Sequence, residues 1–324
     1  MFLFLRKHWF LVGLLLVTLL GLVWPEPGRD GGWLMTRWTA PLAVAVIFFF
    51  NGMILPLATL RKDVGRWSLH LFSQSWLFVV SPLVMGLLIM LFASGLPWAW
   101  KTGLLFFAML PCAVSTVVVY TQRADGNVTT ALFNTVVANL LGVIWVPLVA
   151  TLLMSTGGGV DWRAAAGMIG KVALVVLFPL LLGVIFQRLR PETSRRLALR
   201  AGCINSLLIL YISYSGFSTV NLSDGSGLTP PLVFQVAVPL LVFVVGGFLL
   251  MARLVQLFPW RPVDRDAVFY CTTIKTLAAG LPMGAIIFPR DQWPAESWLF
   301  PLLIGYTLQL ILGGLWAGRK DQSH

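Results

Sequence analysis

The sequence has few charged residues for its length. Charged side chains make up 11% of its 324 residues, against about 25% in soluble domains. Hydrophobic residues make up 58%, and the mean hydropathy is +0.87. A soluble protein needs more charge to cover its surface, whereas a helix bundle in a bilayer needs apolar side chains outside as well as inside. The composition therefore excludes a soluble globular protein and predicts an integral membrane protein.

Acidic and histidine residues are especially scarce. There are 12 Asp and Glu, 23 Lys and Arg and three His, and the acids and histidines fall in expected loops, in the tail or near the ends of apolar runs. General acid–base catalysis needs such groups inside a site, so we expect no enzyme. The net charge of +11 is spread between apolar runs rather than clustered on a polar face, which argues against a nucleic-acid partner.

Cysteines are equally few. Cys112, Cys203 and Cys271 lie in apolar stretches, and an odd number without paired spacing indicates neither a disulfide framework nor a zinc site. We expect all three to be small core residues.

Apolar windows long enough to cross a bilayer, about 20 residues, occur ten times. The first is followed by Trp24-Pro25-Glu26-Pro27 rather than by a small-residue cleavage site, so we interpret it as a retained helix and not as a signal peptide. The expected transmembrane helices lie near residues 8–24, 39–60, 67–93, 101–122, 127–154, 167–187, 198–219, 232–256, 267–288 and 297–317.

The basic residues are distributed unevenly between the two sides of these spans. Sixteen of the 23 lie on the side of both termini, six lie on the opposite side, and Lys275 falls within a span. Because Lys and Arg next to short spans favour the cytoplasm, this bias predicts that both termini are cytoplasmic.

Ten spans divide into two halves of five, with a glycine-rich joint at residues 155–159. An odd number of spans per half makes the second half run upside down, as in the inverted repeats of secondary transporters. We therefore expect repeats at residues 1–156 and 157–324. The fourth span is interrupted at Leu110-Pro111 and the ninth at Gly280-Leu281-Pro282. Interruptions at corresponding places indicate a binding site at the midplane, although Pro and Gly can also kink lipid-facing helices.

Neutral polar residues gather around the interrupted fourth span and the start of the fifth. Polar groups in hydrocarbon cost free energy and tend to be kept for packing or for a substrate pathway. A Ser or Thr can also hydrogen-bond to its own helix backbone. The residues concerned are Ser115, Thr116, Asn127, Thr130, Asn134 and Thr135.

The ninth span contains Lys275, between Thr273 and Thr276. Lys275 is about 15–20 Å from either end of the span at a rise of about 1.5 Å per residue, which is too far for its side chain to reach the interface. A buried ammonium must pair, lose its proton or face a cavity. No expected span contains an acid. We therefore expect that Ser115, Thr116, Asn134 or backbone carbonyls of the facing broken helix compensate Lys275, or that it binds an anion or is a neutral amine.

These motifs resemble the bile acid:sodium symporter superfamily, and most of all its bacterial SBF-like branch, which keeps a Lys in the ninth span. The resemblance covers almost the whole chain. It implies a ten-helix membrane protein with a panel domain of spans 1, 2, 6 and 7 and a core domain of spans 3–5 and 8–10, in which broken spans 4 and 9 cross. It also implies symport of an organic anion, with sodium in the best-known members, in a bacterial-type inner membrane. The residues that carry it are Leu110-Pro111, Ser115-Thr116, Tyr120, Gly126-Asn127-Val128 and Leu277 to Pro282.

The resemblance carries over only part of the family's sodium sites. It implies a candidate sodium site at Ser115, Thr116 and Thr135. Three further ligand positions, a Ser, a Glu and a Gln in the sodium-coupled members, are occupied by Ala131, Tyr270 and Leu77. Affinity for hard cations rises with ligand charge, and an ammonium repels sodium by about 4 kcal/mol at about 4 Å and an effective dielectric of about 20. Two-sodium coupling is therefore not expected.

The leading hypothesis is a secondary transporter of an organic anion with a midplane site where the broken spans cross. Lys275 either binds the anion or takes the place of the coupling ion, which is a proton or sodium. The alternatives are a membrane enzyme or lipid-handling protein with a Ser115/Lys275 dyad, and a non-transporting assembly factor. We expect no cofactor beyond the candidate sodium, and the oligomeric state stays open. The predicted binding residues are Ser115, Thr116, Asn127, Thr130, Asn134, Thr135, Thr273, Lys275, Thr276 and Gln309.

Overall fold

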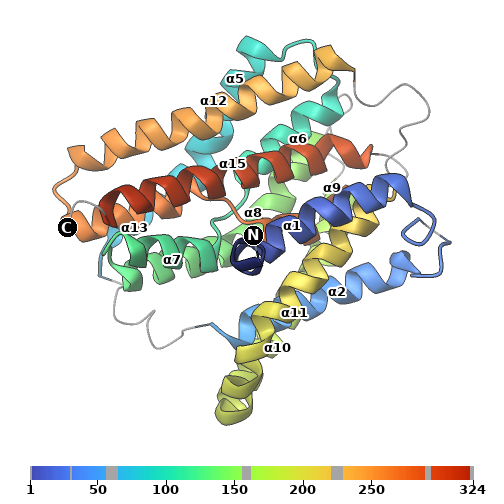
Figure 1. Ribbon diagram of the computed structural model, residues 1–324, viewed down its shortest axis with the longest axis horizontal. Coiled ribbons are helices and arrows are strands. Elements are labelled where there is room, and N and C mark those ends of the chain that lie inside the picture. The colour runs from blue at the N-terminus through green and yellow to red at the C-terminus, as the bar shows by residue number, and fades with distance from the viewer. Residues whose placement is uncertain are drawn as a thin grey trace. The chain divides into compact units, whose positions relative to one another are not determined.

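The computed structural model describes residues 2–29, 31–55, 65–154, 162–219, 229–288 and 293–321. Within these ranges the chain forms helices joined by short connections, and its only extended pairing is one isolated bridge (Figure 1). The predicted all-α class is confirmed. The expected joint between repeats, residues 155–159, lies outside the described residues.

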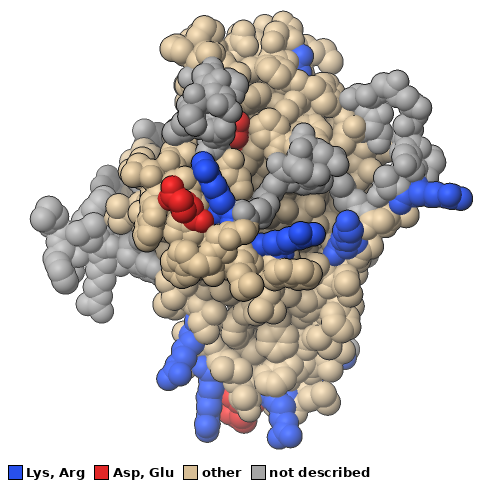
Figure 2. Space-filling view, turned by 90° about the vertical axis from the view of Figure 1, so that its right-hand side faces the viewer, with Lys and Arg blue, Asp and Glu red and all other residues tan. Residues whose placement is uncertain are grey.

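Six of the described helices are long and apolar enough to cross a membrane. They correspond to the third, fifth, sixth, seventh, eighth and tenth expected spans. Their bounds are Trp67–Phe92, Val128–Met154, Gly170–Leu189, Pro191–Phe217, Pro230–Leu257 and Ala295–Gly318. The face of the molecule in Figure 2 carries few Lys, Arg, Asp or Glu side chains among its described residues. Such a surface suits a multi-pass membrane protein.

The chain divides into two compact units, each built from separate stretches of sequence. Unit 1 comprises Met1–Leu55, Ala150–Thr229 and Leu281–Leu299, and unit 2 comprises Pro56–Val149, Pro230–Gly280 and Phe300–His324. Three helices have residues in both units: α8 (Val128–Met154), α14 (Leu277–Ile287) and α15 (Ala295–Asp321).

Unit 1 contains the first, second, sixth and seventh expected spans. In it α1 packs along α11, and α2 packs along α10 and α11 (Figure 1). Its helices are α1 (Phe2–Val23), α2 (Thr36–Met53), α9 (Trp162–Val172), the π-helical segment η2 (Ala173–Leu177), α10 (Phe178–Leu189) and α11 (Pro191–Phe217).

Two glycines allow the backbones of α2 and α10 to approach each other closely. A Cβ atom at Gly52 would collide with the backbone carbonyl oxygen of Leu180, and one at Gly183 would collide with that of Phe49. Small residues at a helix interface allow this kind of packing in membranes, where no hydrophobic force drives helices together.

Unit 2 contains the remaining expected spans. In it α12 packs along α5, and α13 packs along α7 (Figure 1). Besides parts of α8, α14 and α15, its helices are α4 (Trp67–Ser75), the π-helical segment η1 (Trp76–Val80), α5 (Ser81–Phe92), α6 (Trp98–Met109), α7 (Val114–Arg123), α12 (Pro230–Leu254), the short 3₁₀ helix η3 (Val255–Leu257) and α13 (Pro262–Thr273).

The fourth span is broken where the sequence predicts. Helix α6 ends at Met109 and Leu110 is extended, with φ −63° and ψ 146°. The ring of Pro111 causes this, because a proline disfavours the helical conformation of the residue before it. Helix α7 begins at Val114.

The predicted position of the break in the ninth span is wrong. Helix α13 ends at Thr273 and α14 begins at Leu277, so the chain is helical through Gly280 and Pro282. The Thr276 hydroxyl accepts a hydrogen bond from the Ala279 N–H at 3.3 Å, which caps the start of α14. Neighbouring groups in a membrane bundle can accommodate a proline within a helix, so Pro282 need not end it.

The cysteines only partly follow their prediction. Cys112 and Cys271 are buried, whereas Cys203 on α11 is exposed. The prediction was wrong for Cys203 because an apolar stretch of a membrane helix has a lipid-facing side as well as a core side.

We predict that Gly183→Leu destabilises the protein. The new side chain would meet the α2 backbone, and overpacking of this kind costs about 1–3 kcal/mol. Thermal unfolding of the purified protein should show a lower midpoint. The matched control is Gly170→Leu on α9, where a Cβ meets nothing within 4 Å and we expect a change within about 0.5 kcal/mol. Equal midpoints for the two variants would contradict the close approach of α2 and α10.

Candidate functional site

The two broken spans of unit 2 meet at their extended segments. Cys112 and Lys275 form an antiparallel bridge. The Ala113 N–H donates to the Ile274 carbonyl at 3.1 Å, and the Thr276 N–H donates to the Pro111 carbonyl at 2.9 Å. Each break therefore supplies hydrogen-bond partners for backbone groups that the other break has released from a helix.

Two side chains bind further backbone groups of this crossing. Asn139 on α8 donates its amide to the Cys112 carbonyl at 2.9 Å, and Gln309 on α15 accepts from the Lys275 N–H through Oε1 at 2.9 Å. Buried backbone groups that lack a partner cost free energy. The two amides thus hold the extended segments in place from the fifth and the tenth expected spans.

The Lys275 side chain is buried at the crossing, with 1% of the residue exposed. Its ammonium donates to the Leu77 backbone carbonyl at 3.4 Å. No carboxylate among the described residues forms an ion pair with it. This contact is with a backbone carbonyl, but the carbonyl belongs to the third expected span rather than to the facing broken helix that the sequence predicts.

The Leu77 carbonyl is available because of a proline. In η1 the Ser81 N–H donates to the Trp76 carbonyl, one residue further back than in an α-helix. The next residue, Pro82, has no N–H to offer to Leu77. The Leu77 carbonyl therefore lacks these donors from its own helix and accepts a hydrogen bond from the Lys275 ammonium.

Four helix ends meet at the same crossing: the C-termini of α6 and α13 and the N-termini of α7 and α14. A helix end carries about half an elementary charge, negative at the C-terminus and positive at the N-terminus. Broken helices that place such ends near the midplane form the ion and substrate sites of secondary transporters.

A cavity of about 210 Å³ adjoins Lys275. Thr272, Thr273 and Gln309 line it together with apolar residues of α5 and α12. An ammonium beside such a space can receive an anion that the protein itself does not supply.

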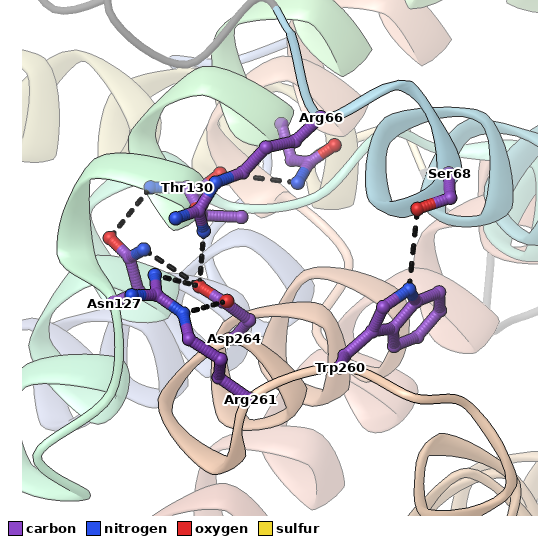
Figure 3. Close-up of polar contacts among 8 residues, drawn as sticks. Arg66, Ser68, Asn127, Thr130, Trp260, Arg261 and Asp264 are labelled. Atoms are coloured by element: carbon purple, nitrogen blue, oxygen red, sulfur yellow. Dashed lines mark hydrogen bonds and ion pairs between the residues drawn. The ribbon is translucent and has the colours of Figure 1, made fainter.

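A second polar cluster surrounds Asp264 in the first turn of α13, before the ninth expected span (Figure 3). Arg66, which precedes α4, donates to it at 2.5 Å, Arg261 at 2.8 Å and Asn127 at 2.7 Å. Asn127 also caps α8 by accepting from the Thr130 N–H at 3.2 Å. The cluster therefore connects the starts of three helices of unit 2.

These contacts set the ionisation of Asp264. Burial raises the pKa of its carboxyl, and the hydrogen bonds from Arg261, Asn127 and Arg66 lower it by more, so the pKa lies below its ordinary value. The carboxylate is thus held in its charged form by its neighbours.

A third cluster connects α4 to α8. The His70 Nδ1 and the Asn134 Oδ1 form a hydrogen bond at 3.1 Å, and Gln74 donates to the Asn134 carbonyl at 3.2 Å. His70 is buried and its ring lies 4.0 Å from that of Phe133, centroid to centroid. Asn134 thus belongs to a helix-packing contact. His70 lies near the start of its span, as expected, and is packed inside the unit.

The structure brings three of the predicted binding residues together at the crossing: Lys275, Thr276 and Gln309. Thr273 lines the adjoining cavity and donates to its own helix at the Phe269 carbonyl. The other predicted residues are distributed elsewhere in unit 2. Asn127 and Thr130 lie in the Asp264 cluster and Asn134 in the His70 cluster.

The three residues of the candidate sodium site have different surroundings. Ser115 is exposed, Thr116 hydrogen-bonds to Tyr306, and Thr135 donates to the Leu132 carbonyl of its own helix. Their convergence on an ion stays a prediction.

Sequence reasoning missed Arg66, Asp264 and the Leu77 carbonyl. It placed the two charges in loops or at span ends, although Arg261 and Asp264 are spaced as an i, i+3 pair at a helix start. For Leu77 the available signal was a proline five residues later within a continuous apolar run.

Comparisons with known proteins agree with one another. The model of the SBF-like CPA transporter family matches residues 8–321. "Sodium/bile acid cotransporter 7" of Danio rerio is 30% identical over 318 residues, which cover 96% of this chain and 92% of that protein. The protein of that name from Rattus norvegicus is 28% identical, covering 96% and 91%. "Putative symporter YfeH" of Escherichia coli (strain K12) is 28% identical, covering 96% and 92%.

We predict that Gln309→Leu and Asn139→Leu each lower the free energy of unfolding by about 1–3 kcal/mol. Each change leaves one buried backbone group of the crossing, the Lys275 N–H or the Cys112 carbonyl, without its partner. Thermal or denaturant unfolding would measure this. The control is Ser206→Ala on α11, whose exposed hydroxyl bonds only to its own helix. A loss no larger than that of the control would contradict the role of the two amides.

We also predict that Asp264 makes stability depend on pH in the acid range. The pKa of its carboxyl is lower in the folded than in the unfolded state, so its contribution is fully present above the unfolded value, about 3.9. The contribution is lost as pH falls through the folded pKa. Unfolding midpoints measured between pH 7 and the acid limit of solubility should fall less steeply for Asp264→Asn than for wild type. Parallel pH profiles would show that the ion pairs contribute nothing.

Proposed function

Because the chain belongs to the SBF-like CPA transporter family, we propose that it moves an organic anion across the membrane by alternating access at the crossing of its two broken helices. The family and the names of its relatives make it a membrane transporter of the bile acid:sodium symporter type and not an enzyme. The nature of the anion, the coupling ion and the residues of the site are what we propose.

The observation that carries the proposal is the environment of Lys275. Its buried ammonium has backbone oxygen but no carboxylate partner among the described residues, and it borders a cavity. An ammonium in hydrocarbon costs free energy unless it has a functional partner. An anionic substrate supplies the charge that the surrounding protein does not.

The coupling ion in this proposal is a proton. Sodium near Lys275 would be repelled by about 4 kcal/mol at about 4 Å and an effective dielectric of about 20. Of the candidate sodium ligands, Ser115 is exposed, Thr116 bonds to Tyr306 and Thr135 bonds to its own helix. A lysine can alternate between ammonium and amine, so Lys275 can take up and release the coupling proton itself. The relatives named as sodium cotransporters make sodium the competing ion.

The proposed architecture has ten spans in two inverted repeats, residues 1–156 and 157–324, with both termini in the cytoplasm of a bacterial-type inner membrane. Six long apolar helices and two broken spans support it. So does the similar use of Asn139 and Gln309, which bind the two extended segments from the last helix of each half.

The contacts do not favour the alternative of a Ser115/Lys275 dyad. Ser115 is exposed on α7, whereas Lys275 is buried and its ammonium donates to the Leu77 carbonyl. A non-transporting assembly factor would show no movement of any anion, so the transport assay below tests that alternative as well.

We predict that purified protein in liposomes takes up labelled cholate when a proton gradient is imposed, and that Lys275→Met reduces this uptake at least tenfold. Arginine keeps the charge but does not release its proton. Lys275→Arg should therefore still exchange cholate between the two sides while losing proton-driven accumulation. The control Lys171→Met removes an exposed lysine and should leave uptake unchanged.

Uptake that responds to sodium alone and survives Lys275→Met would refute both the proposed site and the proposed coupling. Unfolding midpoints of all four proteins show whether a loss of uptake reflects a loss of fold.

A further inference from the structure

The cavity beside Lys275 has a buried part, its floor, and an exposed part, its mouth, which are lined by different kinds of residue. The polar residues that line it are buried, with Thr272 and Gln309 each 2% exposed. Val242 and Leu250, which also line it, are 41% and 50% exposed. The buried part of the lining therefore holds the polar groups beside apolar ones such as Val244 and Phe248, whereas the exposed lining on α12 is apolar.

The mouth lies on helices that are strongly apolar. Helices α5 and α12 lie side by side (Figure 1) within the candidate spans Trp67–Phe92 and Pro230–Leu257, whose mean hydropathies are 2.3 and 2.5. An exposed apolar side chain on such a helix faces lipid. A ligand with an apolar part can therefore enter this cavity from the hydrocarbon.

The floor offers hydrogen-bond donors to a small anionic group. The Lys275 ammonium has three N–H groups and donates one to the Leu77 carbonyl. Gln309 uses its oxygen for the Lys275 backbone, which leaves its NH₂ group as a donor. The hydroxyls of Thr272 and Thr273 already donate to their own helix. Ser81 on α5 also lines the cavity with its hydroxyl. The lysine, the glutamine and this serine are therefore the groups that can bind an anion.

The size of the cavity limits the shape of the ligand. Its volume of about 210 Å³ corresponds to about seven water molecules at about 30 Å³ each. Pockets that enclose a drug-sized ligand measure about 300–1,000 Å³. A slim chain that continues into the bilayer fits this space better than a fused ring system. Gly246 and Gly247 on the α12 wall leave room for such a chain, because a Cβ at either position meets nothing within 4 Å.

We propose that this groove, between α5 and α12, binds a single-chain fatty carboxylate. The carboxylate lies at Lys275 and Gln309, and the acyl chain runs past Gly246 and Gly247 into the bilayer. This inference rests on the proposed function, since it makes the transported anion a lipid-derived carboxylate that enters from the membrane.

The test uses a palmitate analogue with an intact carboxylate and a diazirine on its chain. The full-length protein is placed in nanodiscs of phosphatidylcholine and photolabelled at pH 8, and mass spectrometry maps the labelled residues. We expect label on α5 and α12. Unlabelled palmitate should compete for the groove at least tenfold better than methyl palmitate, which lacks the charge. It should also compete at least tenfold better than cholate, whose carboxylate suits Lys275 and permits transport but whose fused ring system fits the groove less well.

Three variants locate the ligand. Gly247→Leu fills the groove, and Lys275→Met removes its charge, so each should reduce labelling at least fivefold. Gly202→Leu, at an exposed glycine of α11 with equal free space, should leave labelling unchanged. If Gly247→Leu does not fold, Gly246→Val fills the same groove with a smaller side chain.

Several results would overturn the inference. Equal competition by methyl palmitate would indicate an apolar lipid site, equal competition by cholate would indicate a ring-shaped anion, and undiminished labelling of Gly247→Leu would place the chain elsewhere. These failures are distinct from a failure of the proposed function. If cholate uptake depends on Lys275 but the groove stays unlabelled, the proposed lipid groove is refuted and the proposed function is not. If uptake does not depend on Lys275, the proposed transport site is refuted.

Discussion

Backbone groups cannot remain unpaired inside hydrocarbon, and the whole site of unit 2 depends on how this requirement is met. Pro111 stops one helix and exposes its neighbours' N–H and C=O groups. The segment around Lys275 leaves its helix to pair with them. Asn139 and Gln309 bind two further backbone groups of these segments. The position of Lys275 is a consequence of this pairing, because its side chain projects from the extended segment.

The charged groups of unit 2 illustrate two solutions to the cost of burial. Asp264 lies at a helix start with two arginines and an asparagine around it, so its charge is balanced within the protein. Lys275 has a single carbonyl contact through its ammonium and a cavity instead of a counter-charge. A charge with a counter-charge beside it contributes to structure. A charge without one raises the free energy of the folded protein in the membrane, and such charges are kept where they have a function.

How far the sequence predicts these features depends on whether their cause is local. Composition suffices for the all-helical membrane class, and Pro111 acts on the residue directly before it, so both predictions are confirmed. The ninth break is different, because Ile274 to Thr276 leave the helix to pair with a segment about 160 residues away. Pro282 was the wrong local signal, and no spacing within the span reveals the partner. Likewise, Asn134 has the same polarity as Asn139, and only the packing of α4 on α8 assigns it to His70.

The covalent attachment of Lys275 has a consequence for energy conversion. A dissociable coupling ion has a concentration on each side of the membrane, and the difference between the two can do work. A cation that is part of the chain has no such concentrations, so no gradient of that cation acts through it, however well it fits its site. The only component of the Lys275 side chain that can exchange with the solution is the proton on its nitrogen.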